Sequence, residues 1–183
     1  MFFNLFLKFC SHRFFNIFIS FIICLYTCYN LVQKCIKTSS NGQQQAESTF
    51  SSTFILGGQI KGDAVGLYLI YPEGNFIEVS EENPFFQIGE TKYGRPILVR
   101  AFEPDMTFED AIKLLMVSFD STIKANLSVG PPLDLHIYEI DRYAPPKSLV
   151  IEAENPYFKM VSREWAQALK ESLHSLPKFS FDE

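Results

Sequence analysis

From residue 53 onwards, apolar and polar residues alternate in short runs that are typical of β-strands. Two turn sequences separate these runs, Lys61-Gly62-Asp63 and Pro72-Glu73-Gly74-Asn75, and they predict an antiparallel meander with tight turns. Gly57 and Gly58 fall inside the first run, which predicts a bulge or a close backbone approach at that point. The predicted strands are residues 53–60, 66–71 and 76–79, with 85–88 closing the meander.

Further along the chain, apolar residues recur every three or four positions and predict two long helices. The first begins at Thr107, which forms a capping box with Asp110, and the second begins at Asn155-Pro156. Alternating runs at 133–140 and 148–152 predict two strands between them. The predicted core faces are Phe108, Ile112, Leu115, Phe119 and Ile123 on the first helix, and Phe158, Val161, Trp165, Leu169 and Leu173 on the second.

A strand-to-helix corner joins the two regions in the stretch PFFQIGETKYGRPIL, residues 84–98. The pattern predicts a strand that stops at Gly89, a turn through Glu90-Thr91-Lys92, and a helix with Pro96 in its first turn. Such corners carry catalytic groups in some folds and are ordinary polar turns in most. The order of strands, two helices, strands and a helix predicts an α+β domain with helices stacked on an antiparallel sheet.

The first 52 residues differ from the rest. Residues 1–37 are an apolar segment, 38–52 a polar linker, and 53–183 the folded domain. The run 14–32 would span roughly 28 Å as a helix, close to the thickness of a bilayer core. Two interpretations stay open: a transmembrane helix, or a misassigned start to the reading frame. Tyr26 is followed by no small-residue cleavage site of the kind that ends a secretory signal.

Charge and cysteine usage exclude several classes of function. Residues 41–183 carry 12 basic and 21 acidic side chains, a balance that is unsuited to binding nucleic acid. All four cysteines lie in the first 35 residues, so we expect no disulfide framework, metal site or cofactor in the folded domain. This cysteine usage fits the cytoplasm.

The chain also lacks the common catalytic motifs. It contains no G-x-S-x-G, H-E-x-x-H, G-K-[ST] or C-x-x-C, and its three histidines are scattered. His136 lies on a predicted strand face, where a structural role is expected.

Three segments in order resemble one known family: FILGGQIKGDAVGLYLIYPEGNFIEV, PFFQIGETKYGRPIL and MTFEDAIKLLMVSFDSTI. They are similar to the second half of proteasome-type β-subunits, and in detail to the bacterial Anbu (ancestral β-subunit) family. The resemblance runs from about residue 50 to Pro177 and includes NLSVGPPLDL. It implies a partial Ntn-hydrolase αββα sandwich, the C-terminal half of the domain, preceded here by an apolar N-terminal helix.

The family implies a threonine-type endopeptidase that assembles into rings and degrades peptides. Its nucleophile is an N-terminal threonine whose own α-amine acts as the base, supported by an aspartate and a lysine. These are expected about sixteen and about thirty-two residues after the threonine, and none of Thr27, Thr38, Thr49 or Thr53 has them. The resemblance therefore predicts a proteasome-like subunit that is truncated and inactive.

The same resemblance assigns residues that border the family site. Glu90 in the corner stands where β-subunits carry a serine, and Thr91 offers a hydroxyl beside it. In ANLSVG, residues 125–130, Asn126 stands where β-subunits carry an aspartate, and Ser128 stands where they carry a serine. The bordering residues are Gly89, Glu90, Thr91, Asn126 and Ser128.

A second interpretation makes the chain a non-catalytic assembly partner in a proteasome-like ring. In this case its helices would contact like subunits, and the run 14–32 would anchor it to a membrane. Both interpretations predict a homo-oligomer or ring, because half a domain leaves apolar surface and unpaired strand edges.

Overall fold

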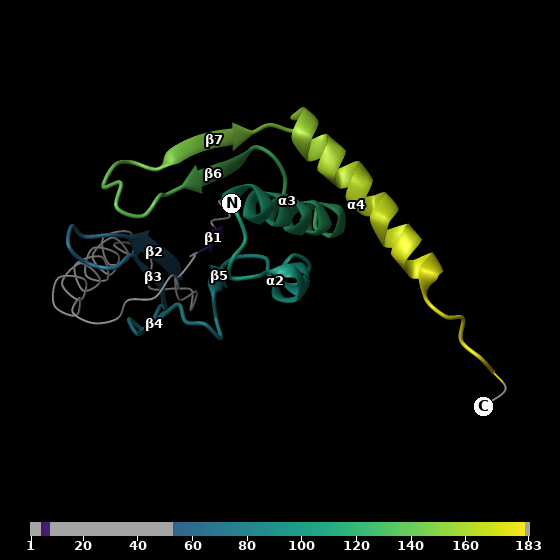
Figure 1. Ribbon diagram of the computed structural model, residues 1–183, viewed down its shortest axis with the longest axis horizontal. Coiled ribbons are helices and arrows are strands. Elements are labelled where there is room, and N and C mark those ends of the chain that lie inside the picture. Colours follow the sequence, from purple (N-terminus) through teal and green to yellow (C-terminus); the bar gives the residue numbers. More distant parts are fainter. Residues whose placement is uncertain (1–4, 8–52, 182–183) are drawn as a thin grey trace, which may run out of the picture. The chain divides into compact units, whose positions relative to one another are not determined.

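The computed structural model describes residues 5–7 and 53–181, which form two compact units. The sheet unit comprises 5–7, 53–88 and 138–146, and the helical unit comprises 89–137 and 147–181. Along the chain, strands are followed by two helices, two strands and a last helix (Figure 1). This confirms the predicted α+β class, although the strands form three small antiparallel sheets rather than one.

The sheet unit contains the predicted meander. Its strands are antiparallel and lie in the order β2-β3-β4. Gly57 pairs with Leu67 in an unbroken register, so there is no bulge at this point. A Cβ at Gly57 would lie 3.1 Å from Leu67 Cδ1 and 3.8 Å from the Gly66 carbonyl oxygen, so the close neighbour is a side chain and not the predicted backbone. The strands are β2 (Phe54–Gly58), β3 (Gly66–Ile70) and β4 (Phe76–Glu78).

The fourth predicted strand does not close this meander. Strand β5 (Phe85–Gln87) instead pairs antiparallel with β1 (Leu5–Leu7), with Leu5 opposite Gln87. Pro84 immediately precedes β5 and has no N–H to donate, which disfavours continuing a ladder from β4 through the turn. The predicted strand exists, but its predicted partner was wrong.

A small cluster holds the sheet unit together. Tyr68 and Ile70 are buried and pack with Leu56, and the Tyr68 ring meets Phe76 edge-on at 5.8 Å between centroids. Burial of the phenol, together with the nearby Glu78 carboxylate, raises the pKa of Tyr68 to about 12.

The loop 138–146 is attached to this unit by paired hydrogen bonds between Gln59 and Asp141. The Asp141 backbone N–H donates to Gln59 Oε1 at 2.7 Å, and Gln59 Nε2 donates to Asp141 Oδ1 at 2.8 Å.

The helical unit contains three helices and a hairpin, and both predicted N-caps are confirmed. Thr107 Oγ1 accepts from the Asp110 backbone N–H at 3.1 Å, and Asn155 Oδ1 accepts from that of Phe158 at 3.1 Å. The elements are α2 (Arg95–Ala101), α3 (Phe108–Ala125), β6 (Leu133–Ile137), β7 (Lys147–Ile151) and α4 (Pro156–Ser175).

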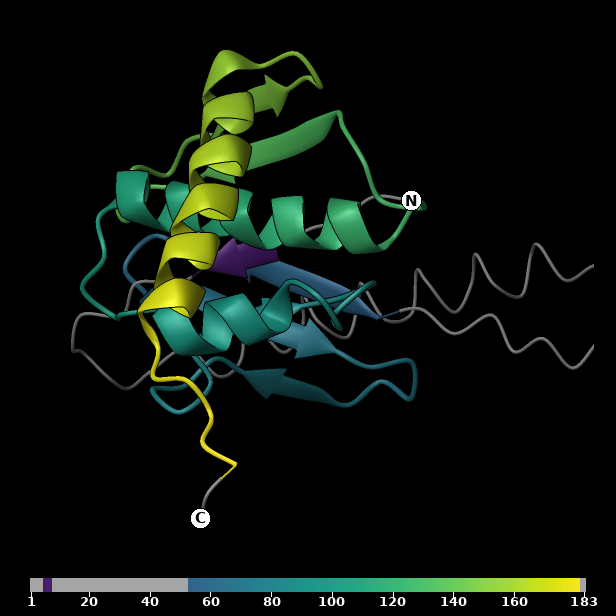
Figure 2. The ribbon, with the colours of Figure 1, turned by 90° about the vertical axis from the view of Figure 1, so that its right-hand side faces the viewer.

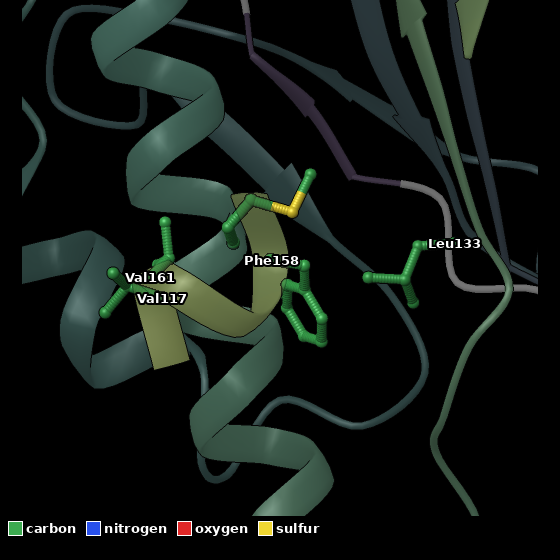
Figure 3. Close-up of a cluster of buried hydrophobic side chains, with 5 residues drawn as sticks. Val117, Leu133, Phe158 and Val161 are labelled. Carbon is green, nitrogen blue, oxygen red and sulfur yellow. The ribbon is translucent and has the colours of Figure 1, made fainter. Parts of the chain in front are cut away.

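The core of the helical unit lies where α4 crosses α3 beside the hairpin (Figure 2). Figure 3 shows Val117 of α3 facing Phe158 and Val161 of α4, with Leu133 of β6 at the side. A charged group adds a polar link between the same helices. Lys124 Nζ lies 3.1 Å from the buried Asp120 Oδ1 and donates to Ser162 Oγ at 2.8 Å.

The predicted core faces need two corrections. On α3 the buried residues run without a break from Leu114 to Ser118, because α2 and α4 both pack against this helix. Phe108, which the single-stripe pattern placed in the core, is 43% exposed. On α4, Leu169 and Leu173 were also predicted to be buried, but the C-terminal half of this helix extends past α3 and leaves them exposed (Figure 1).

Gly94 fixes how closely the start of α2 approaches α3. A Cβ at this position would lie 2.8 Å from Thr122 Oγ1 and 3.0 Å from the Ser118 carbonyl oxygen. Ser118 and Thr122 are each 3% exposed, so neither can move aside into solvent. The absence of a side chain at Gly94 therefore sets the position of the corner that precedes α2.

Several predictions fall outside the described residues: the run 14–32 and the four cysteines. Among the helices that the structure does describe, none combines the length and apolar character required to cross a membrane.

We expect Gly94→Ala to lower the free energy of unfolding by about 1–3 kcal/mol, because the added methyl group overpacks the contact with Ser118 and Thr122. Chemical denaturation measures the change. Gly130→Ala is the matched control, since nothing lies within 4 Å of a Cβ there, and its effect should stay within about 0.5 kcal/mol. Equal effects for the two variants would contradict the close contact.

The raised pKa of Tyr68 predicts a loss of stability in alkaline solution. The folded state favours the neutral phenol, so the contribution is complete below pH 10.0 and disappears as the pH rises through about 12. Tyr68→Phe should therefore show a shallower fall in melting temperature over this interval than the unaltered protein. If the melting temperatures of the two proteins fell equally over this interval, the phenol of Tyr68 would have the same pKa in the folded and unfolded states.

Candidate functional site

The corner that leads into α2 begins with a backbone turn that favours glycine. Gly89 has φ +83°, a left-handed conformation that costs little without a Cβ. It turns the chain directly after β5, as the sequence predicts, and places Glu90 at the start of the helical unit. Pro96 then lies in the first turn of α2, also as predicted.

Glu90 is the centre of a hydrogen-bonded group. The Lys92 backbone N–H donates to Glu90 Oε1 at 2.8 Å, and Asn126 Nδ2 donates to Oε2 at 2.9 Å. Both bonds favour the ionised carboxylate, with the Lys92 backbone N–H making the largest contribution, so the pKa of Glu90 is lowered. The carboxylate is thus charged at neutral pH and fixed through both oxygens.

Asn126 also hydrogen-bonds Ser128 and so fixes the position of the Ser128 side chain. Its Oδ1 accepts from the Ser128 backbone N–H at 2.9 Å and from Ser128 Oγ at 2.7 Å. A carboxylate only accepts hydrogen bonds, so the amide nitrogen of Asn126 must face Glu90 and its oxygen must face Ser128. We call this chain of bonds, Glu90 to Asn126 to Ser128, the corner cluster.

Two helix ends hold the corner cluster in place. Asn126 caps the C-terminus of α3, where its backbone N–H donates to the Thr122 carbonyl oxygen at 2.8 Å. Thr122 is also one of the two residues that Gly94 approaches, so one contact region positions both halves of the cluster.

Of the five residues predicted to border a site, the structure brings three together through their side chains: Glu90, Asn126 and Ser128. Gly89 supplies the turn, and Thr91 takes part through its backbone, which also hydrogen-bonds the Glu90 carboxylate. Sequence reasoning missed Gly94 as the residue that sets the spacing. Its place one residue before Arg95-Pro96 at a helix start was the available signal.

The corner cluster presents acceptors. The Ser128 hydroxyl proton is committed to Asn126, which leaves the oxygen lone pairs of Ser128 to accept from a donor. Such a group suits an amine or an N–H. Ser128 is bonded to an amide rather than to a base, so the cluster does not activate it as a nucleophile.

His136, for which a structural role was expected, lies opposite Ser148 in the hairpin, with 2.8 Å between Nδ1 and Oγ. Within residues 5–7 and 53–181, no group of three or more His, Cys, Asp or Glu side chains is arranged to hold a metal ion.

We expect the melting temperature of the Asn126→Asp variant to fall as the pH rises from 4 to 7. The carboxylates of Asp at position 126 and of Glu90 would then face each other at the 2.9 Å contact. At pH 4 a shared proton relieves the repulsion, and at pH 7 both groups are charged. Thermal melting at the two pH values measures the change.

Asn155→Asp is the matched control for this substitution. Asn155 only accepts a hydrogen bond, at the N-terminus of α4, so a carboxylate there should hold or raise stability over the same interval. Identical pH profiles for the two variants would show that Asn126 does not donate to Glu90.

Comparisons with known proteins agree with this geometry. The family model described as proteasome subunit matches residues 18–137. A search of curated proteins finds no match. Among solved structures, Anbu from Yersinia bercovieri is 35% identical, with a TM-score of 0.80 over 94% of this chain and 70% of that one.

Two further structures are similar. Anbu from Hyphomicrobium sp. strain MC1 is 42% identical, with a TM-score of 0.72 over 85% of this chain and 64% of that one. The helical assembly of the Anbu complex from Pseudomonas aeruginosa is 38% identical, with a TM-score of 0.81 over 87% of this chain and 66% of that one. This chain thus spans 64–70% of the length of these relatives. It belongs to the proteasome subunit family of Ntn hydrolases and, within it, to the Anbu (ancestral β-subunit) group.

Proposed function

We propose that this chain is a subunit of a proteasome-like assembly and that its described residues form the supporting part of a threonine-peptidase site rather than its nucleophile. The corner cluster is the observation that carries this proposal. It gathers Glu90, Asn126 and Ser128 at the place where the resemblance puts the residues that border the family site.

The chemistry of the corner cluster fits such a supporting role. In an N-terminal threonine peptidase, the α-amine must accept a proton from the hydroxyl, so it has to be held in place through its own N–H groups. The oriented hydroxyl of Ser128 is a suitable acceptor for one of those N–H groups, and the Glu90 carboxylate fixes the amide that orients it. The β-subunit pattern has a serine at position 90 and an aspartate at position 126, whereas this chain has Glu90 and Asn126. One negative charge is therefore present in both, but at different positions.

The residues that would have to complete the site are not matched in this chain. Thr53 is the threonine nearest the start of the described domain, and the positions of its expected aspartate and lysine are Leu69 and Phe85. These are apolar side chains on β3 and β5, and neither exchanges protons or carries charge. Thr27, Thr38 and Thr49 lie outside the described residues and fail the same spacing. We therefore propose that residues 53–181 supply no nucleophile to the site and are equivalent to the C-terminal part of an αββα Ntn-hydrolase sandwich.

The second candidate, a non-catalytic assembly partner, differs in what the chain contributes to a complex. Exposed apolar side chains on α4 and β4 support it, because surfaces of this kind mark contacts with other proteins. In either case we propose that the partners are like subunits. A membrane tether at 14–32 stays a prediction.

We expect the purified chain to hydrolyse fluorogenic peptides no faster than a buffer blank, and to form no adduct with a peptide epoxyketone. That reagent requires both a threonine hydroxyl and its free α-amine, and intact-mass spectrometry detects the adduct. A proteasome preparation run in parallel provides the positive control. Cleavage that disappears when one hydroxyl residue of this chain is replaced, for example in Thr91→Val or Ser128→Ala, would overturn the proposal.

A further inference from the structure

The loop that joins β6 to β7, residues 138–146, has no apolar anchor. It is longer than most hairpin loops, which have about two to five residues. None of residues 138–146, all of which the structure describes, is buried, and Ile140 and Tyr143 are 51% and 43% exposed. Burial of apolar surface is the main source of local stability, so this loop depends on polar contacts to stay in place.

These polar contacts converge on Gln59, which directly follows β2. Gln59 Oε1 accepts from the Asp141 backbone N–H at 2.7 Å, and Gln59 Nε2 donates to Asp141 Oδ1 at 2.8 Å and to the Asp63 carbonyl oxygen at 2.9 Å. The half-buried Gln59 is therefore fixed by its own turn and holds the loop through both ends of its amide. From within the loop, the Tyr143 hydroxyl also donates to Asp141 Oδ1, at 3.0 Å.

Two residues of the loop are held in a backbone conformation that L-residues disfavour. Asp141 has φ +63° and Tyr143 has φ +48°, both in the left-handed region. Aspartate tolerates this region better than tyrosine does, because its short side chain can hydrogen-bond locally. Both residues can return to ordinary backbone angles once the bonds to Gln59 are broken. Opening the loop therefore releases strain, which reduces the free-energy cost of losing its exposed hydrogen bonds.

We propose that residues 138–146 form a latch that opens while the sheets and helices stay folded, and that the Gln59–Asp141 pair holds it closed. Opening presents the peptide bond between Arg142 and Tyr143 in an exposed segment without buried residues. Proteases nick exposed loops of this kind, so the latch is a processing site for a protease that cuts after basic residues. This inference is independent of the proposed function, since it uses no residue of the corner cluster.

Limited digestion of the full chain with trypsin tests the latch, and mass spectrometry identifies fragments that begin at Tyr143. Gln59→Glu places a carboxylate against that of Asp141, so cleavage after Arg142 should accelerate at least about tenfold. Cleavage after Lys178, in the exposed C-terminal tail, should keep its rate and serves as the internal reference.

Gln167→Glu is the matched control. It makes the same change opposite another carboxylate, that of Glu171 on α4, which Gln167 Nε2 contacts at 2.8 Å. It should leave cleavage after Arg142 unchanged.

A double variant tests the pair itself. Adding Asp141→Asn to Gln59→Glu again places an amide opposite a carboxylate, with the two roles exchanged, and asparagine also tolerates a positive φ. This double variant should return the rate of cleavage after Arg142 to within about threefold of that of the unaltered chain. A variant that merely misfolds would not be rescued in this way.

Equal rates of cleavage after Arg142 in Gln59→Glu and the unaltered chain would overturn the latch. A double variant that is cut as fast as Gln59→Glu would do so too, because the pair would then not hold the loop closed. If Gln59→Glu accelerates cleavage after Lys113, within α3, to the same extent, the loop opens only when the whole domain unfolds and the inference is wrong.

Discussion

The close contact of Gly94 with α3 is the constraint on which the rest of the helical unit depends. Ser118 and Thr122 are buried, so the backbone of the corner can approach α3 only because position 94 has no side chain. This approach brings Glu90 within hydrogen-bonding distance of Asn126, which follows the last turn of the same helix. A packing contact without chemical function of its own therefore determines where the polar groups meet.

The side-chain amide of Asn126 sets which groups donate and which accept along the corner cluster. An ionised carboxylate on one side and a hydroxyl on the other fix which end of the amide donates and which accepts. An aspartate in this position would accept on both sides and could not bridge to a second carboxylate without an added proton. Glutamate at 90 and asparagine at 126 are therefore compatible as a pair, and each depends on the presence of the other.

Local sequence signals predicted the features that depend on neighbouring residues. The turn at Gly89, the caps at Thr107 and Asn155, and the meander follow from backbone preferences within a few positions, and the structure confirms them. The partner of β5 and the exposure of Leu169 and Leu173 were predicted wrongly, because both depend on which distant segment lies alongside. The three site residues that meet in the cluster were named through a family resemblance. Spacing alone cannot show that positions 90 and 126 are neighbours.

The wrong prediction for α4 follows from how an amphipathic pattern arises. An apolar stripe records that a helix face is covered, but it does not record whether the covering surface belongs to the same chain. On α4 a single stripe runs from Phe158 to Leu173, and α3 covers only its first half. Leu169 and Leu173 continue the same helical spacing beyond the part of α4 that packs on α3, and they are 50% and 69% exposed. The pattern therefore predicts the direction in which a helix face points, but only the tertiary arrangement decides how much of that face is buried.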